Sequence, residues 1–173
     1  MQTALYARNS KVNMFDVVTI GAATLDVFFQ SSQFKLIEQA GGLALCERYN
    51  EKVDVEQAMI TSGGAATNVA VGLARLGLKV GCIAEVGKDV AGSVVLSDLQ
   101  REGVSTDLLV QEKSEVTGIS GLLISKDGAR TALVYRGAAR LLSVSDVNWN
   151  TLETKWVHLS SIGNVDLINK TLE

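Results

Sequence analysis

A run of small residues followed by an amide side chain is the feature of this sequence that most directly implies chemistry. Gly63 and Gly64 precede Ala65, and Asn68 follows in an apolar stretch that ends at Gly77. Small residues at the start of a helix let a polar ligand approach backbone N–H groups, where the helix dipole is positive. The spacing therefore predicts a binding site for a polar small molecule at the start of a helix.

Two charged residues outside this run have different expected roles. Asp89 ends the turn Gly87-Lys88-Asp89, and hydrogen bonds of an Asx-type turn explain it without a ligand, so we expect a structural role. Arg136 has small and apolar neighbours, and a guanidinium near a sheet edge could bind an acidic or phosphorylated ligand. A solvent-exposed arginine at a strand end explains the same pattern equally well, so both interpretations of Arg136 stay open.

Alternating strands and helices must position these residues. The apolar run at 16–20 predicts a buried strand, and residues 79–85 predict another. Apolar residues at helical spacing predict helices over 68–76 and 91–102, each followed by a glycine. A last strand is predicted at 156–160. Strand–helix–strand units of this kind favour a parallel sheet with helices on its faces, which is the α/β fold class.

Further short strands interrupt that alternation. Two β-rich runs, 117–125 and 130–135, flank the segment Lys126-Asp127-Gly128-Ala129, in which Asp-Gly favours a hairpin turn because it tolerates positive φ. More strands are predicted before the glycine run, at residues 25–29, 45–49 and 53–60. Together these segments predict a small additional sheet attached to the α/β body.

Composition narrows the class of protein. The 173 residues are 47% hydrophobic, which is enough for one domain with a sizeable core. A net charge of −3 argues against nucleic-acid binding, and no apolar run reaches the roughly 18 residues of a membrane span. Cys46 and Cys82 lack metal-ligand spacing, so we expect reduced thiols and a cytoplasmic protein without a metal site. Residues 1–14 are expected to be a disordered leader before a folded part at 15–173.

The sequence resembles the PfkB, or ribokinase-like, family of carbohydrate kinases. The resemblance runs from about Phe15 to the end and includes the segment Leu133-Val134-Tyr135-Arg136-Gly137-Ala138, which is common in sugar-directed members. It implies a three-layer α/β/α fold with a mainly parallel sheet and a small β-sheet lid, truncated here to the N-terminal part. The residues that match the first signature of the family are Gly63, Gly64, Ala66, Asn68, Ala70, Gly77 and Gly87.

The resemblance also implies which residues bind the substrate. Asp26 matches a carboxylate that accepts hydrogen bonds from sugar hydroxyls, and Thr24 matches a frequent polar contact. Gly64 and Ala65 would let the backbone approach the sugar, and Asn68 would offer a donor and an acceptor. The structural alternatives are a turn aspartate, a tight turn before a helix, and an asparagine that caps it. The candidate substrate-binding residues are Thr24, Asp26, Gly63, Gly64, Ala65, Asn68 and Arg136.

The reaction implied by the family is transfer of the ATP γ-phosphate, with Mg²⁺, to a hydroxyl of a sugar or nucleoside. The second family signature, with its Gly-Ala-Gly-Asp core and catalytic base, does not occur in these residues. We therefore expect this chain to hold the substrate-binding part alone, without a catalytic residue or cofactor site, and to be inactive by itself. ATP and Mg²⁺ are expected for the full-length protein, and a homodimer through the lid is compatible with the resemblance.

Other function classes fit some of the same residues. A non-catalytic sugar-binding or regulatory protein would share the recognition residues, and sugar binding without ATP would favour it. A dinucleotide-binding oxidoreductase fits less well, because Gly21-Ala22-Ala23-Thr24 lacks the G-x-G-x-x-G spacing. The candidate residues do not discriminate among ribose, fructose derivatives, 2-keto-3-deoxygluconate and nucleosides.

Overall fold

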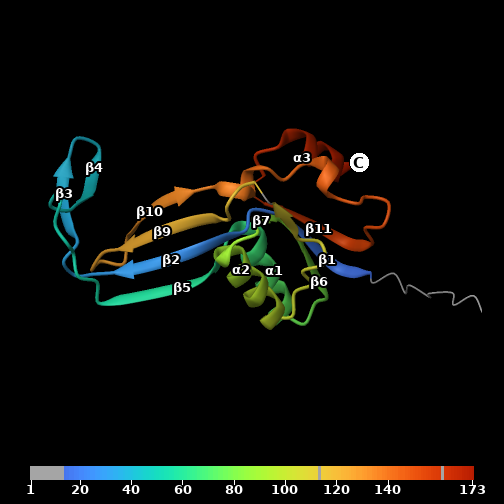
Figure 1. Ribbon diagram of the computed structural model, residues 1–173, viewed down its shortest axis with the longest axis horizontal. Helices are drawn as coiled ribbons and strands as arrows, with labels where there is room; N and C mark the ends of the chain where they lie inside the picture. Colours follow the sequence, from blue (N-terminus) through green and yellow to red (C-terminus); the bar gives the residue numbers. More distant parts are fainter. Residues whose placement is uncertain (1–13, 113, 161) are drawn as a thin grey trace, which may run out of the picture.

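A three-stranded parallel sheet forms the centre of the fold (Figure 1). The structure is a computed structural model that describes residues 14–112, 114–160 and 162–173, so the predicted leader lies outside the described residues except for Met14. In the sheet, β1 (Phe15–Gly21) lies between β11 (Thr154–Ser160) and β6 (Val80–Ile83) and is parallel to both. Strand β1 is almost entirely buried, as expected for the central strand of a parallel sheet covered on both faces.

Helices cover both faces of this sheet. On one face pack α1 (Ala65–Arg75) and α2 (Val90–Arg101). On the other pack α3 (Val165–Leu172) and residues next to the short turns η1 (Gly137–Arg140) and η2 (Val144–Asp146). The predicted three-layer α/β/α arrangement is therefore confirmed. Representative core residues are Ala70, Cys82 and Leu99 on the first face and Ile20, Ile83 and Leu167 on the second.

A second sheet of four strands, here called the outer sheet, extends away from this body (Figure 1). Its order is β10 (Arg130–Tyr135), β9 (Gly118–Ile124), β2 (Thr24–Gln30) and β5 (Gln57–Gly63). Strand β2 is antiparallel to β5 and parallel to β9. The chain passes from the body into the outer sheet between β1 and β2. The outer sheet confirms the small additional sheet that the sequence predicts.

The segment between β2 and β5 differs from the prediction. It forms a separate hairpin of β3 (Lys35–Gln39) and β4 (Gly42–Cys46) at the far end of the outer sheet (Figure 1). The strand predicted at 45–49 therefore overlaps only the end of β4, and β3 was not predicted. Ala40 and Gly41 form the turn. Gly41 and Gly42 have φ of 117° and 129°, which glycine adopts without strain.

Two other predicted strands were misplaced. The strand predicted at 53–60 is β5, which begins later and continues to Gly63. The strand predicted at 79–85 is divided into β6 and β7 (Glu85–Gly87), because β6 pairs with β1 whereas β7 pairs with β8 (Val110–Glu112). Within the described ranges, no helix is both long and apolar enough to cross a membrane.

Candidate functional site

The candidate site lies where β1 passes into β2, beside the end of β5. Thr24 is opposite Gly63 in the sheet register, and the Thr24 hydroxyl donates a 2.9 Å hydrogen bond to Asp26 Oδ1. A Cβ added to Gly63 would lie 2.1 Å from Asp26 Oδ2, so the Asp26 carboxylate occupies the space that any side chain at Gly63 would need. The structure thus brings together three of the predicted residues, Thr24, Asp26 and Gly63.

The turn from β5 into α1 explains the second glycine. Gly64 has a φ of 101°, and a Cβ there would lie 2.4 Å from the carbonyl oxygen of Ala22, so both conformation and space require glycine. The N–H of Ala66 donates to the same carbonyl at 3.1 Å, which fixes the start of α1 against the β1–β2 connection. Gly64 is the N-cap of α1 and supplies no side-chain cap.

A cavity of about 780 Å³ opens beside Thr24, within the size range of small-molecule sites. Its polar lining includes Thr24, Arg136, Arg140 and Asn164, and the rest is mainly apolar. Asn164 caps α3 by accepting the N–H of Leu167 at 3.1 Å. The full lining is Ala22, Thr24, Val134, Arg136, Ala139, Arg140, Ile162, Gly163, Asn164 and Val165.

The two arginines of this cavity differ in their partners. Arg140 pairs with Glu115 at 3.2 Å, and Glu115 also accepts the Tyr135 hydroxyl at 2.6 Å. The Tyr135 hydroxyl, the Val116 N–H and Arg140 lower the pKa of Glu115, so this carboxylate stays ionised beside Arg140. Arg136 forms no ion pair with any described residue, and its side chain is exposed. Arg136 is therefore the guanidinium that remains available to an anionic ligand.

Asn68 lines a different cavity, of about 340 Å³, between β5, α1 and α2. Its backbone N–H bonds to the Gly64 carbonyl at 3.0 Å, and α1 already begins at Ala65, so Asn68 lies inside the first turn and is not the helix cap. Its side chain is exposed. Asn68 is therefore not among the residues that line the same cavity as Thr24 and Arg136.

Asp89 has the structural role that its turn suggested. It caps α2 by accepting the Gly92 N–H at 2.7 Å, and it also accepts the N–H and the hydroxyl of Thr117 at 2.7 and 2.8 Å. Burial raises the pKa of Asp89, but these donors outweigh burial and the net direction is down. The turn after β7 is thereby fixed to the residue that precedes β9.

One polar residue near the glycine turn was missed by sequence reasoning. Asp98 on α2 is 8% exposed and accepts the backbone N–H of Ser62, the residue before Gly63, at 2.8 Å. The available signal was its spacing, because Asp98 follows Val95 by three residues and precedes Leu99, on the apolar side of its helix. Among the described residues, no group of three or more His, Cys, Asp or Glu side chains could hold a metal ion.

Comparison with known proteins gives consistent matches over most of the chain. The family described as pfkB family carbohydrate kinase matches residues 14–172. Fructokinase from Vibrio alginolyticus is 35% identical over 102 residues, which are 58% of this chain and 33% of that protein. A 5-dehydro-2-deoxygluconokinase from Clostridium beijerinckii is 30% identical over 146 residues, which are 83% of this chain and 38% of that protein.

Solved structures show the same fold. Fructokinase from Halothermothrix orenii superposes with a TM-score of 0.66 at 26% identity, covering 91% of this chain and 52% of its own. Ribokinase from Arabidopsis thaliana, complexed with ribose and ATP, has a TM-score of 0.58 at 19% identity and covers 77% and 41%. The chain thus spans less than two fifths of the two curated relatives and about half of these solved chains.

Proposed function

Because this chain belongs to the pfkB family of carbohydrate kinases, we propose that it forms the sugar-binding part of an enzyme that phosphorylates a sugar hydroxyl. The observation that carries the proposal is the hydrogen-bonded pair of Thr24 and Asp26, in which Asp26 packs on Gly63 and Thr24 lines a cavity of about 780 Å³. A carboxylate that accepts from one fixed hydroxyl keeps lone pairs for others, so Asp26 can accept hydrogen bonds from sugar hydroxyls.

The other proposed substrate-binding residues surround this pair. Gly64 and Ala65 start α1 without a side-chain cap, so their backbone can approach a polar ligand. Arg136, which lines the cavity without an ion-pair partner among the described residues, would bind an acidic group of the substrate. Asn68 is proposed as a further contact with a smaller contribution, because it lines a different cavity from Thr24 and Arg136.

We further propose that ATP and Mg²⁺ complete the reaction and bind outside this chain. An Arabidopsis relative of the same fold is complexed with ribose and ATP, which supports ATP as the phosphoryl donor. Phosphoryl transfer requires in-line positioning, a residue that orients the nucleophile and stabilisation of the transferred charge. Since relatives are more than twice as long as the matched part, we assign those functions to their unmatched part and expect this chain alone to be inactive.

The outer sheet is proposed as the lid over the sugar and as the contact between two subunits. Excluding water from the reacting phosphate is a common reason for such closure. Its exposed apolar side chains support association with a second copy: Met59, Ile60, Leu133, Val134 and Tyr135 are each about half exposed or more. A cytoplasmic setting is also proposed, in keeping with the two unpaired thiols Cys46 and Cys82.

The decisive test compares two identical chemical changes. Asp26→Asn should weaken sugar binding by about tenfold or more, because it removes charge-assisted hydrogen bonds. Asp54→Asn makes the same change at an exposed carboxylate remote from the cavity lining and should leave affinity unchanged. Titration calorimetry with ribose, fructose, 2-dehydro-3-deoxygluconate and adenosine, with and without ATP, would measure both. Equal affinity of the two variants would contradict the proposal.

This titration does not by itself separate a kinase from a non-catalytic sugar-binding protein. A non-catalytic sugar-binding protein would bind its sugar identically in both ATP conditions, and so would the sugar-binding part of a kinase. ADP release separates the two, since a full-length kinase of this family releases ADP as it phosphorylates its sugar. Sugar-dependent ADP release that is lost in Asp26→Asn supports the kinase, whereas sugar binding without ADP release supports the binding protein.

A further inference from the structure

The end of β5 is held by a residue outside its own sheet. Strand β5 lies at the edge of the outer sheet and has only β2 beside it in the described part of the chain. Alternate N–H groups of an antiparallel edge strand face away from the sheet and lack a strand partner. The N–H of Ser62 is such a group, and Asp98 Oδ2 on α2 accepts it at 2.8 Å.

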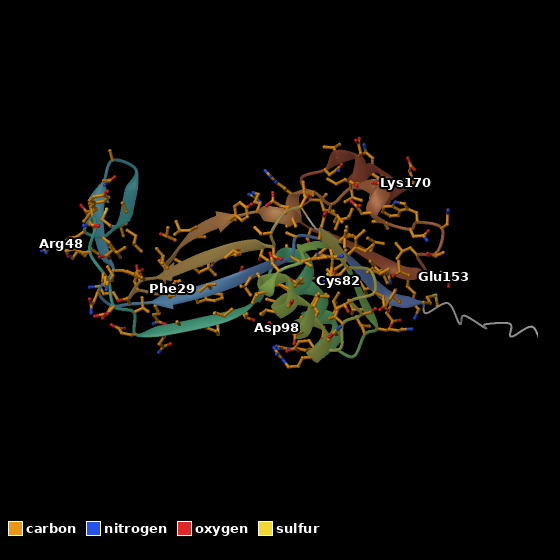
Figure 2. All side chains as sticks on the ribbon, in the orientation of Figure 1. Phe29, Arg48, Cys82, Asp98, Glu153 and Lys170 are labelled. Carbon is orange, nitrogen blue, oxygen red and sulfur yellow. The ribbon has the colours of Figure 1, made fainter. Side chains whose placement is uncertain are left out.

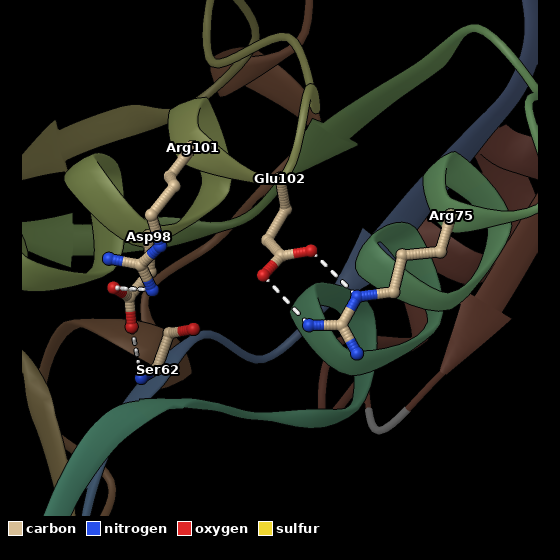
Figure 3. A network of polar contacts seen from close by, with 5 residues as sticks. All are labelled: Ser62, Arg75, Asp98, Arg101 and Glu102. Carbon is tan, nitrogen blue, oxygen red and sulfur yellow. Dashed lines mark hydrogen bonds and ion pairs between the residues drawn. The ribbon is translucent and has the colours of Figure 1, made fainter.

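The surroundings of Asp98 make it a strong acceptor. Its other carboxylate oxygen pairs with Arg101 at 2.7 Å, as Figure 3 shows. Burial raises the pKa of Asp98, but the Ser62 N–H and Arg101 together lower it by more. The net direction is down, so the carboxylate is ionised near neutral pH. A hydrogen bond to a charged acceptor is about twice as strong as a neutral one.

A neighbouring ion pair has similar chemistry but connects different elements. Arg75 on α1 makes a two-pronged contact with Glu102, the C-cap residue of α2, at 2.7 and 2.8 Å. This pair joins the two helices and does not touch β5 (Figure 3). Figure 2 shows Asp98 beside the junction of the helices and the outer sheet, whereas Phe29 lies farther out along that sheet. Asp98 is therefore the member of this network that links the body to the outer sheet.

The position of Ser62 connects this link to the sugar site. Ser62 immediately precedes Gly63, where an added Cβ would lie 2.1 Å from Asp26 Oδ2. A small displacement of the β5 end would change the space available to that carboxylate. We propose that Asp98 is a positioning residue that holds the Ser62–Gly64 turn in place against Asp26 and so keeps the sugar site formed. This inference rests on the proposed function, because the turn that Asp98 holds is the proposed sugar-binding turn.

Amide hydrogen exchange of the chain tests the contact without any ligand. By alternation, the N–H of Ile60 faces outward like that of Ser62, and Ile60 is exposed. In the wild-type chain the Ser62 amide should exchange about tenfold or more slowly than the Ile60 amide, because only Ser62 has the Asp98 acceptor. Equal exchange at the two amides would overturn the proposal, and this comparison requires no variant to fold.

Variants then test whether the contact positions the site. Asp98→Ala should speed exchange at Ser62 by about tenfold and weaken sugar affinity, and Asp98→Asn, whose amide oxygen can still accept, should restore part of both. Glu102→Ala breaks the helix–helix pair and should change neither, at a comparable loss of thermal stability. Faster exchange at Ser62 in Glu102→Ala to the same extent would overturn the proposal. Failure of the chain to bind any sugar would reject the proposed function and leave the exchange result standing.

Discussion

At the scale of single residues, Gly63 and Gly64 lack side chains for different reasons. The absence of a side chain at Gly63 leaves space for the Asp26 carboxylate, which a Cβ at Gly63 would clash with. Gly64 has a positive φ and faces the backbone of Ala22. A carboxylate can rotate away at small cost, whereas a backbone carbonyl inside a folded body cannot. The first glycine is therefore expected to serve binding and the second to serve folding.

This difference gives a paired prediction. Gly63→Ala should displace Asp26 and weaken sugar affinity by about tenfold, the effect of losing one charge-assisted hydrogen bond, with little change in Tm. Gly64→Ala should lower the free energy of unfolding by about 1 to 3 kcal/mol, because it adds both strain and a clash. Calorimetric titration and thermal unfolding of both variants would measure this. A Gly63→Ala chain with full affinity would count against Asp26 as a sugar ligand.

Residue types and spacing predicted only part of the site. Thr24, Asp26 and Gly63 were identified, and they lie together. Asn68 was identified by the same motif, yet it lines a different cavity, between β5, α1 and α2. Spacing along a helix does not determine which other elements pack against a given side chain. Asp98 was missed, because its importance comes from a contact with Ser62, which is distant in sequence.

At the scale of elements, Asp89 joins the start of α2 to the start of β9. Asp89→Ala should lower the free energy of unfolding by about 1 to 2 kcal/mol, since it removes a helix cap and the bonds to Thr117. Chemical unfolding would measure the loss. Asp54→Ala, at an exposed carboxylate, is the control and should change stability by less than about 0.5 kcal/mol. Equal effects of the two substitutions would contradict this role.

The same contact predicts a pH dependence of stability. The pKa of Asp89 is lowered on folding below its ordinary value of 3.8, so the unfolded chain binds a proton more readily than the folded chain. Its stabilisation is complete above that ordinary value and is lost as the pH falls through the lowered folded pKa. Unfolding curves from pH 6 downward should therefore converge for wild type and Asp89→Ala at the most acidic end. A difference in stability that stays constant throughout would contradict it.

The elements were predicted best where the apolar pattern alone determines them. The buried strand β1 and the helices α1 and α2 follow from their apolar spacing. The division of residues 79–85 into β6 and β7 could not be predicted, because it depends on which strand pairs with each half. The β3–β4 hairpin had a usable signal in Gly41-Gly42, because paired glycines tolerate the positive φ that a tight hairpin turn needs.

At the scale of the whole molecule, the outer sheet and strand β11 are two of the places where apolar side chains are exposed. Leu133 on the outer sheet is 62% exposed, and Trp156 on the edge strand β11 is 73% exposed. Leu133→Lys should abolish the proposed self-association through the outer sheet, because it would bury a charge in the contact. Trp156→Lys should preserve it. Analytical ultracentrifugation over a wide concentration range would decide, and the reverse pattern would indicate pairing through β11.

On this account, the described residues by themselves form a sugar-binding site. The most direct measurement is calorimetric titration of the wild-type chain with the sugar panel in the absence of ATP. We predict saturable binding of one sugar with one site per chain and no phosphorylated product when ATP is added. A cooperatively folded chain that binds none of these sugars would contradict the claim.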